Sequence, residues 1–224
     1  AVVPAWNEQG RVGGVVAGLR ALGLPVLVVD DGSRDATAAE ARAAGAAVLS
    51  QANAGKGAAI LAGCRWACAR GHAHVLLADA DGQHAPREAV RLLAALARAP
   101  APDLVIGARR LERARQPALR RAANRLSSLM VTAAAGRRIW DSQSGYRLLD
   151  PRRLLALPLC GRRYDLETEA CILAARAGWR VREVPITAIY NGKRSGMRPV
   201  VDTVRFLRAV ARALMRLRGK RTAV

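Results

Sequence analysis

The chain has 224 residues, of which 51% are hydrophobic and 24% are charged, and its formal net charge is +20. This length is enough for one substantial hydrophobic core and too short for two full-sized domains. So many apolar residues exclude a disordered polycation, whereas the charge indicates a polyanionic partner such as nucleic acid, an anionic membrane or a phosphorylated substrate.

Short apolar runs alternate with longer helical patterns through the first half of the chain. The predicted strands are 1–5, 25–31, 46–50, 74–81 and 103–108, and the predicted helices are 11–22, 35–44, 56–70 and 86–98. Continuously apolar strands joined by helices predict an α/β fold with a mostly parallel central sheet and helices on both faces.

The second half follows a different pattern. An Arg-rich helical stretch covers 109–138 and leads into a polar loop at 140–147. A helix at 165–177, a strand-like run at 181–190 and a basic terminal helix complete the chain. We expect one domain over 1–198 and a basic amphipathic helix over 199–224.

Polar residues follow three of the predicted strands, as Asn7-Glu8, Asp30-Asp31 and Asp79-Ala80-Asp81. The carboxyl ends of parallel strands meet at one edge, where ligands bind in such sheets. Two carboxylates followed by Gln83 suit Mg²⁺ or Mn²⁺ bridging a diphosphate. An acidic turn solvated at a strand end is the alternative interpretation.

Two glycine-containing motifs lie at the same predicted edge. In the motif at 28–37, Asp30 and Asp31 are not needed to cap the next helix, so a carboxylate here could accept hydrogen bonds from a nucleobase or ribose. In the motif at 53–59, Gly55 and Gly57 bracket Lys56, which would admit a phosphate or ribose close to the backbone and a cation. No Walker A pattern is present, which disfavours ATP hydrolysis, and a plain helix-capping loop explains the second motif equally well.

Together and in this order, the motifs are far more specific than each one alone. The chain resembles family 2 glycosyltransferases of the GT-A fold, in particular the branch with dolichol-phosphate mannose synthase and bacterial polyprenyl-phosphate glycosyltransferases. The matching segments are 3–8, 28–37, 53–59, 79–84, 107–109, 141–147, 164–169, 183–186 and 190–206.

The resemblance implies roles for individual residues. Asp81 and Arg109 are the expected catalytic residues, and Asp79, Asp81 and Gln83 the expected metal ligands. The residues expected to bind a nucleotide-diphosphate sugar donor are Pro4, Trp6, Glu8, Asp30, Asp31, Lys56, Asp79, Ala80, Lys193 and Arg194. Those expected on the acceptor side are Arg121, Ser144, Arg147 and Ser195.

A loop that closes over the donor carries the clearest departure from the family. Mannose-specific members commonly show Gly-Glu-Ser-Lys there, whereas this chain reads Gly192-Lys193-Arg194-Ser195. The identities of the sugar and of the nucleotide base therefore stay open.

The chemistry of the acceptor separates two hypotheses. A hydroxyl acceptor needs a positioned base, whereas a lipid phosphate is already anionic and needs orientation and charge neutralisation. The arginines of 109–125 suit a phosphate, and we expect a polyprenyl-phosphate oxygen to attack in the inverting displacement that the family implies. Asp165, Glu167 and Glu169 are the candidate bases for a hydroxyl acceptor on a glycan or lipid, unless they only favour a helix N-terminus.

The positive charge is concentrated after residue 100. Residues 1–100 carry ten basic and eight acidic residues, which leaves +18 for 101–224. On the terminal helix, Arg205, Arg208, Arg212 and Arg216 share one arc, and the opposite side is apolar at Val204, Leu207, Val210, Ala211, Leu214 and Leu217. Such a helix can lie on an anionic membrane, or it can pack on the core with a solvated basic face.

Cysteine usage and the absence of a long apolar run bear on the cellular setting. The four cysteines form no CxxC pair and no secretory signal opens the chain, so we expect a cytoplasmic protein, peripheral on the cytoplasmic face of the membrane, that could require a membrane subunit.

Cys64, Cys68 and His72 could bind zinc, although small buried cysteines explain the spacing equally well. A non-enzymatic nucleic-acid-binding protein is disfavoured, because acidic residues line the predicted site and aromatic residues are few.

Overall fold

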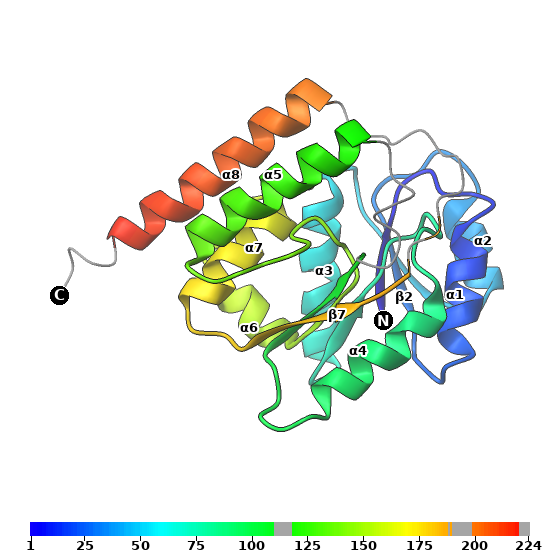
Figure 1. Ribbon diagram of the computed structural model, residues 1–224. Helices are drawn as coiled ribbons and strands as arrows, with labels where there is room; N and C mark the ends of the chain where they lie inside the picture. The colour runs from blue at the N-terminus through cyan, green and yellow to red at the C-terminus, as the bar shows by residue number, and fades with distance from the viewer. Residues whose placement is uncertain (110–117, 188, 190–198, 220–224) are drawn as a thin grey trace.

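A twisted sheet forms the centre of the computed structural model, with helices on both sides of it (Figure 1). The structure describes residues 1–109, 118–187, 189 and 199–219, and within helices α5 and α8 it describes the side chains of 125–135 and 203–216. The strands are β1 (Val2–Ala5), β2 (Leu27–Asp30), β3 (Ala47–Ser50), β4 (Val75–Leu77), β5 (Leu104–Ala108), β6 (Arg147–Leu149) and β7 (Val181–Pro185).

The strand order is β3-β2-β1-β4-β6-β5-β7, and every neighbouring pair is parallel except those that include β6. The carboxyl ends of the six other strands therefore lie at one edge. Because β6 runs in the opposite direction, the segment that precedes it reaches this same edge. The prediction of a mostly parallel α/β sheet with helices on both faces is confirmed.

The two faces of the sheet bury alternate strand residues. Val3 and Val28 pack on the side of α1, α2 and α4, and Val2 and Val29 pack on the side of α3, α5, α6, α7 and α8. The helices are α1 (Val12–Arg20), α2 (Thr37–Ala43), α3 (Lys56–Ala69), the 3₁₀ turn η1 (Pro86–Glu88), α4 (Ala89–Leu96), α5 (Ala118–Ala135), α6 (Pro151–Ala156), α7 (Asp165–Arg176) and α8 (Pro199–Gly219). Because successive side chains of a strand point to opposite faces of the sheet, the fold has two hydrophobic cores, one on each face.

Two short elements were not predicted from the sequence. Strand β6 follows directly on the predicted polar loop, and helix α6 begins after Asp150, whose carboxylate accepts from the backbone N–H of Arg152 at 2.8 Å. Pro151 at the first helical position completes this start signal. A strand of three residues is too short to show a period. The predicted strand 181–190 is also shorter in the structure, because β7 ends at Pro185.

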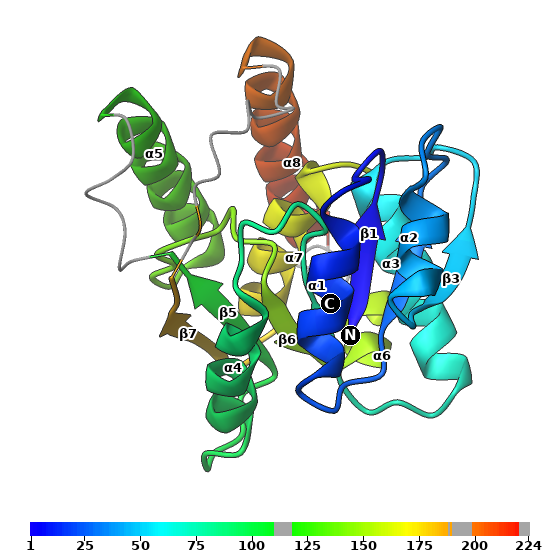
Figure 2. The same ribbon diagram turned by 90° about the vertical axis from the view of Figure 1, so that its right-hand side faces the viewer.

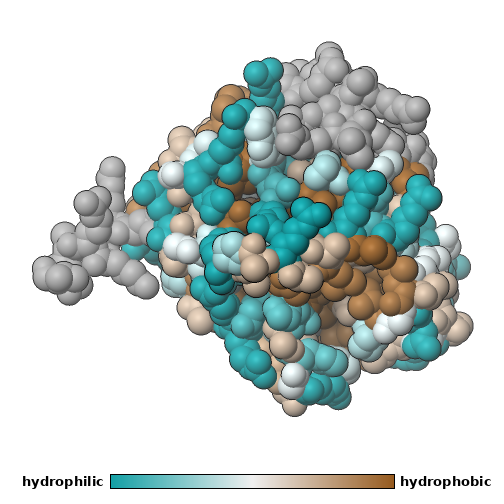
Figure 3. Space-filling model, turned by 60° about the horizontal axis from the view of Figure 1, so that its bottom comes forward, coloured by the Kyte–Doolittle hydropathy of each residue, from teal (hydrophilic) through white to brown (hydrophobic). Residues whose placement is uncertain are grey.

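Helices α5 and α8 lie on the same side of the sheet and extend past its carboxyl edge (Figures 1 and 2). Seen from below, the face that includes the amino ends of the strands is a mosaic of hydrophilic and hydrophobic residues (Figure 3). In the part of the chain that the structure describes, no helix combines the length and the apolar character needed to cross a membrane.

The close approach of α3 to the sheet depends on Gly63. A Cβ atom at this position would overlap the side chain of Val2 and lie 3.2 Å from Cγ2 of Val29. We expect Gly63→Ala to lower the free energy of unfolding by about 1–3 kcal/mol through overpacking. Gly14→Ala is the matched control: it meets no atom within 4 Å, and we expect a gain of about 0.5–1 kcal/mol. Urea denaturation measures both, and equal losses in the two variants would contradict the packing argument.

Candidate functional site

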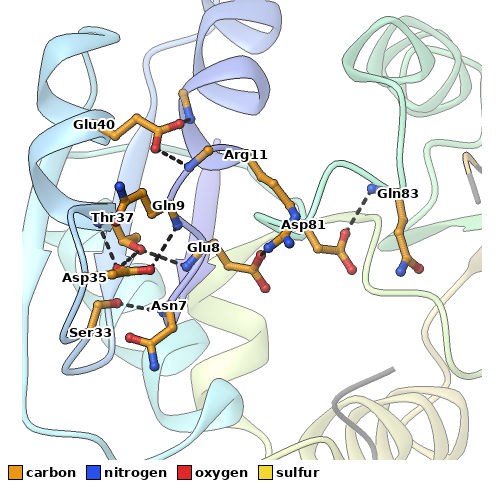
Figure 4. Close-up of polar contacts among 12 residues, drawn as sticks. Asn7, Glu8, Gln9, Arg11, Ser33, Asp35, Thr37, Glu40, Asp81 and Gln83 are labelled. Carbon is orange, nitrogen blue, oxygen red and sulfur yellow. Dashed lines mark hydrogen bonds and ion pairs between the residues drawn. The ribbon is translucent and has the colours of Figure 1, made fainter. Parts of the chain in front are cut away.

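The loops after β1 and β2 hold one another at the carboxyl edge (Figure 4). Asn7 Oδ1 accepts from the backbone N–H of Arg34 at 2.9 Å, and Gln9 Oε1 accepts from that of Ala36 at 3.0 Å. In return, the backbone N–H groups of Asn7, Glu8 and Gln9 donate to the side chains of Ser33, Thr37 and Asp35 at 3.0, 2.8 and 3.2 Å. The reciprocal bonds make the two loops one rigid platform.

Glu40 supports this platform from α2. Its carboxylate accepts from the backbone N–H groups of Gly10 and Gly13 at the start of α1, at 2.5 and 2.9 Å. The platform presents Trp6, whose side chain is 56% exposed, and Glu8, which pairs with Arg11 at 2.8 Å. An exposed ring on a fixed backbone is a suitable surface for stacking a planar base.

Asp30 and Asp31, predicted to contact the donor, are both buried and both support loops. Asp31 accepts from Gln51 Nε2 at 2.7 Å and from the backbone N–H groups of Ala54 and Gly55 at 2.9 and 2.8 Å. Asp30 Oδ1 accepts from the backbone N–H of Ser33 at 3.1 Å. The first task of these carboxylates is therefore to shape the edge of the site. Pro4 and Ala80 are likewise buried.

Asp79 lies just after β4 and forms an ion pair with Lys56. The Lys56 Nζ atom is 2.6 Å from Asp79 Oδ1 and 3.0 Å from Glu167 Oε1. Burial alone would raise the pKa of Asp79, but the charge and hydrogen bond of Lys56, together with His84 and Arg109, more than offset burial and lower it to about 2. Burial alone would lower the pKa of Lys56, and the two carboxylates together raise it instead. Both groups are charged at neutral pH.

His84 lies beside Asp79, and no role was predicted for it from the sequence. Its Nε2 is 3.8 Å from Asp79 Oδ2, and its ring stacks on that of Tyr146 with centroids 5.2 Å apart. Burial lowers the pKa of His84 to about 4, against the opposing effect of Asp79. His84 is therefore neutral at physiological pH. The sequence could have indicated His84 as a residue of the site, because it directly follows Gln83, the last of the predicted metal ligands.

Asp81 and Gln83 are the oxygen donors at the turn after β4. The backbone N–H of Gln83 donates to Asp81 Oδ1 at 3.0 Å, and Figure 4 shows the two side chains beside each other. Among the described residues, no three His, Cys, Asp or Glu side chains gather to hold a metal by themselves. Mg²⁺ and Mn²⁺ need fewer protein ligands when substrate phosphates complete the shell, so this carboxylate and amide fit such an ion.

The alternative zinc site has no support in the described structure. Cys64, Cys68, Cys160 and Cys171 are free thiols. Burial raises the pKa of Cys64 to about 12, which disfavours the thiolate that a metal needs.

Arg109 follows β5 and is held by Asp141. Its Nε and Nη2 atoms donate to the two carboxylate oxygens at 2.8 and 2.9 Å, and its backbone N–H donates to Oδ2 at 3.0 Å. Burial would raise the pKa of Asp141, but the charge and the hydrogen bonds of Arg109 together outweigh it and lower this pKa to about 2. Glu183 in turn accepts from the backbone N–H groups of Trp140 and Asp141. Asp141 had no assigned role in the prediction, although it begins the polar segment that precedes β6.

Ser144 and Arg147, predicted to bind the acceptor, are inside the protein. Arg147 is 2% exposed and donates to the backbone oxygens of Ser142, Ser144 and Glu167, each at 2.8 Å. The Ser144 hydroxyl accepts from the backbone N–H of Tyr146 at 3.3 Å. In this arrangement neither side chain reaches an acceptor, and both hold the loop that carries Asp141.

The remaining predicted residues lie outside what the structure describes. Lys193, Arg194 and Ser195 fall within 190–198, and the side chain of Arg121 belongs to the part of α5 whose side chains are not described.

The three candidate bases are engaged with the protein. Asp165 forms an ion pair with Arg212 at 2.6 Å, and Glu167 pairs with Lys56. Glu169 is fully buried and accepts from the backbone N–H groups of Cys160 and Gly161 at 2.9 and 2.7 Å. These carboxylates therefore link α7 to its surroundings.

Comparison with known proteins identifies relatives along most of the chain. The family model described as Glycosyl transferase family 2 matches residues 1–151. The undecaprenyl-phosphate mannosyltransferase of Micrococcus luteus is 34% identical over 203 residues, which are 84% of this chain and 82% of that protein. The polyprenol monophosphomannose synthase of Mycolicibacterium smegmatis is 33% identical over 83% of this chain and 75% of its own.

Solved structures share the fold. Mannosyl-3-phosphoglycerate synthase from Rubrobacter xylanophilus aligns with a TM-score of 0.75 at 24% identity, over 100% of this chain and 74% of that chain. Glucosyl-3-phosphoglycerate synthase from Mycobacterium tuberculosis, crystallised with Mn²⁺, UDP and phosphoglyceric acid, aligns with a TM-score of 0.73 at 22% identity, over 96% and 76% of the two chains. The similarity supports the predicted GT-A fold.

Gly145 offers a test of how closely Asp79 is packed. A Cβ atom here would lie 2.5 Å from both carboxylate oxygens of Asp79, so Gly145→Ala must displace that side chain. We expect sugar transfer to fall roughly 10- to 100-fold, since small displacements in a site have large effects on rate. Gly14→Ala should keep wild-type transfer. Wild-type rates in Gly145→Ala would show that the position of Asp79 does not matter.

Proposed function

The chain belongs to glycosyl transferase family 2, and on this premise we propose that it transfers a sugar from a nucleotide-diphosphate donor to a polyprenyl-phosphate acceptor. The reaction proposed is a single inverting displacement at the anomeric carbon. The two relatives described above are named for undecaprenyl-phosphate and polyprenol substrates, which supports a lipid phosphate as the acceptor.

The observation that carries this proposal is the engagement of the three candidate bases. Asp165 is paired with Arg212, Glu167 with Lys56, and Glu169 accepts two backbone hydrogen bonds inside the protein. A hydroxyl acceptor would need one of them as a positioned base. A phosphate oxygen is already anionic and needs none, so an acceptor of this class fits the arrangement better than a hydroxyl.

Arg109 is the residue that we assign to the phosphates between donor and acceptor. Asp141 holds its guanidinium at the carboxyl end of β5, and this fixed orientation lowers the entropic cost of binding an anion. Its side chain is partly exposed, in contrast to the buried Arg147. Arg121 is proposed to add positive charge on the acceptor side, and Lys193 and Arg194 on the donor side.

The donor is proposed to lie along the platform and the turn after β4. Trp6 would stack on the base, and Glu8 and Asp30 would meet the ribose. Of the three predicted metal ligands, Asp81 and Gln83 would hold Mg²⁺ or Mn²⁺, because Asp79 is paired with Lys56. When bound, such an ion neutralises the charge that develops on the leaving diphosphate. The solved neighbour with Mn²⁺ and UDP is consistent with this assignment.

The acceptor class is tested with the purified protein alone. A panel of radiolabelled sugar nucleotides is supplied with Mn²⁺ to polyprenyl phosphate and, in parallel, to the matching polyprenol. We expect label in the lipid-phosphate product only, and its loss on chelation of the metal or with Asp81→Asn. Label that enters only the neutral acceptor would contradict the proposal. A requirement for added membranes that protein-free lipid vesicles do not satisfy would indicate a partner subunit.

Helix α8 is proposed as the membrane contact, through a face that includes Val204, Leu207 and Leu214 of the predicted apolar side. Ala209, Val210 and Ala213 are buried against the protein, and Arg212 of the predicted basic side pairs with Asp165. The outward face therefore displays apolar side chains, and neighbouring α5 adds two more. The exposed apolar residues are Leu126 and Leu129 on α5, and Val204, Leu207, Leu214 and Met215 on α8.

This exposed apolar face is rimmed by positive charge. Arg208 lies on the same exposed side of α8, and Arg125 is exposed on α5. An apolar stripe with basic residues beside it suits the interface of an anionic membrane. We therefore propose a catalytic domain over 1–198 and a peripheral, cytoplasmic-face contact through 199–224.

Vesicle flotation tests this contact. We expect the wild-type protein to float with anionic vesicles and much less with zwitterionic ones, and Leu207→Glu with Leu214→Glu to abolish flotation. Val90→Glu is the control, because Val90 is an apolar residue at least as exposed as these leucines and lies on α4, a helix of the opposite face of the sheet. Flotation of the double variant at the wild-type level would remove α8 as the contact. Deletion of 199–224 is a weaker test, since it would also uncover the core beneath the helix.

A further inference from the structure

Lys56 joins two parts of the site that are distant in the sequence. It is the first residue of α3, and its Nζ contacts Asp79 after β4 at 2.6 Å and Glu167 in α7 at 3.0 Å. All three side chains are largely buried. A single ammonium group thus bridges two carboxylates and offsets the repulsion between them.

The glycines beside Lys56 serve the packing of its neighbours. A Cβ atom at Gly55 would lie 2.6 Å from the backbone oxygen of Arg162, and one at Gly57 would lie 2.8 Å from the carbonyl carbon of the same residue. Gly55 also has φ of +99°, which favours glycine. The segment that leads into α7 therefore packs directly on the Gly-Lys-Gly loop. The spacing predicted as a phosphate cradle is explained by this contact.

A continuous network leads from Lys56 to Arg109. The backbone oxygen of Glu167 accepts from Arg147, and Arg147 also donates to the backbone oxygens of Ser142 and Ser144. That segment begins with Asp141, which holds Arg109 through two side-chain hydrogen bonds. The contacts between side chains and backbone along this path are charge-assisted hydrogen bonds and ion pairs in a largely buried setting, where such contacts restrict movement.

We propose that Lys56 is a positioning residue that fixes Asp79 on the donor side relative to the loop that orients Arg109 on the acceptor side. This inference rests on the proposed division of the site into donor and acceptor sides. It assigns Lys56 to the carboxylates of Asp79 and Glu167 and removes it from the predicted donor contacts. Its loss should misalign the two substrates and lower kcat more than it raises the KM of the donor.

A double-mutant cycle between Lys56 and Glu167 tests the proposal. We expect Lys56→Met to lower kcat roughly 10- to 100-fold with less than about a threefold change in donor KM, because alignment is lost while donor contacts remain. Glu167→Gln should lower kcat in the same manner but less. The double variant should be no slower than Lys56→Met alone, since both changes break one link.

The controls separate this role from direct binding and from general destabilisation. Lys56→Arg, which keeps the charge, should recover most of kcat, and thermal unfolding is followed in all variants so that rates are compared only between folded proteins. If Lys56→Met instead raises donor KM at constant kcat and Glu167→Gln behaves as wild type, Lys56 is a donor ligand and the proposal fails. Multiplicative losses in the double variant would also overturn it.

The cycle is measured with whichever acceptor the wild-type protein uses. A hydroxyl acceptor would contradict the proposed function and still leave the coupling of Lys56 to Glu167 measurable. The two ideas can therefore fail separately.

Discussion

The reversed direction of β6 is the constraint on which the site depends. The carboxyl ends of the six other strands lie at one edge, so each of these strands contributes to that edge only the residues that follow it. Because β6 runs between β4 and β5 in the opposite sense, the polar segment 141–146 reaches the same edge by preceding a strand. This places Asp141 beside Arg109 and Gly145 against Asp79, which are distant from it in the sequence.

The reversal has an electrostatic cost, since it brings several acidic groups and an arginine into one partly buried region. The protein offsets this cost with specific partners: Asp79 has Lys56, Asp141 has Arg109, and Arg147 uses three backbone oxygens. Ionised groups persist in such a setting only when they are paired and hydrogen-bonded. The resulting network is also what keeps donor and acceptor residues in a fixed relation.

The arginine-rich half of the chain is divided between structure and surface. Arg147 and Arg212 bind groups of the protein itself, and Arg109 is held by Asp141. Other arginines, such as Arg125 and Arg208, lie on the surface beside exposed leucines. A net charge of +20 is therefore a poor measure of how much of the surface can attract an anion. The surface that can attract an anion depends on which arginines pair with groups of the protein and which lie exposed.

The sequence was sufficient for the α/β class, the edge at which polar residues gather and the family, because periodicity and ordered motifs depend on local chemistry. It was insufficient for β6 and α6, whose few residues carry no period, and for the outward face of α8. An amphipathic pattern identifies two sides of a helix and does not say which side packs when arginines such as Arg212 find a partner such as Asp165.

The same limit applies to the site. The motif residues Asp31, Lys56, Ser144 and Arg147 could be selected from the sequence, but their partners could not, because Lys56 and Glu167 are more than a hundred positions apart. What the sequence determined by itself was which chemical groups come to the carboxyl edge. Only the tertiary structure decided which of them hold one another and which face a ligand, since that choice depends on distances between elements that no local pattern encodes.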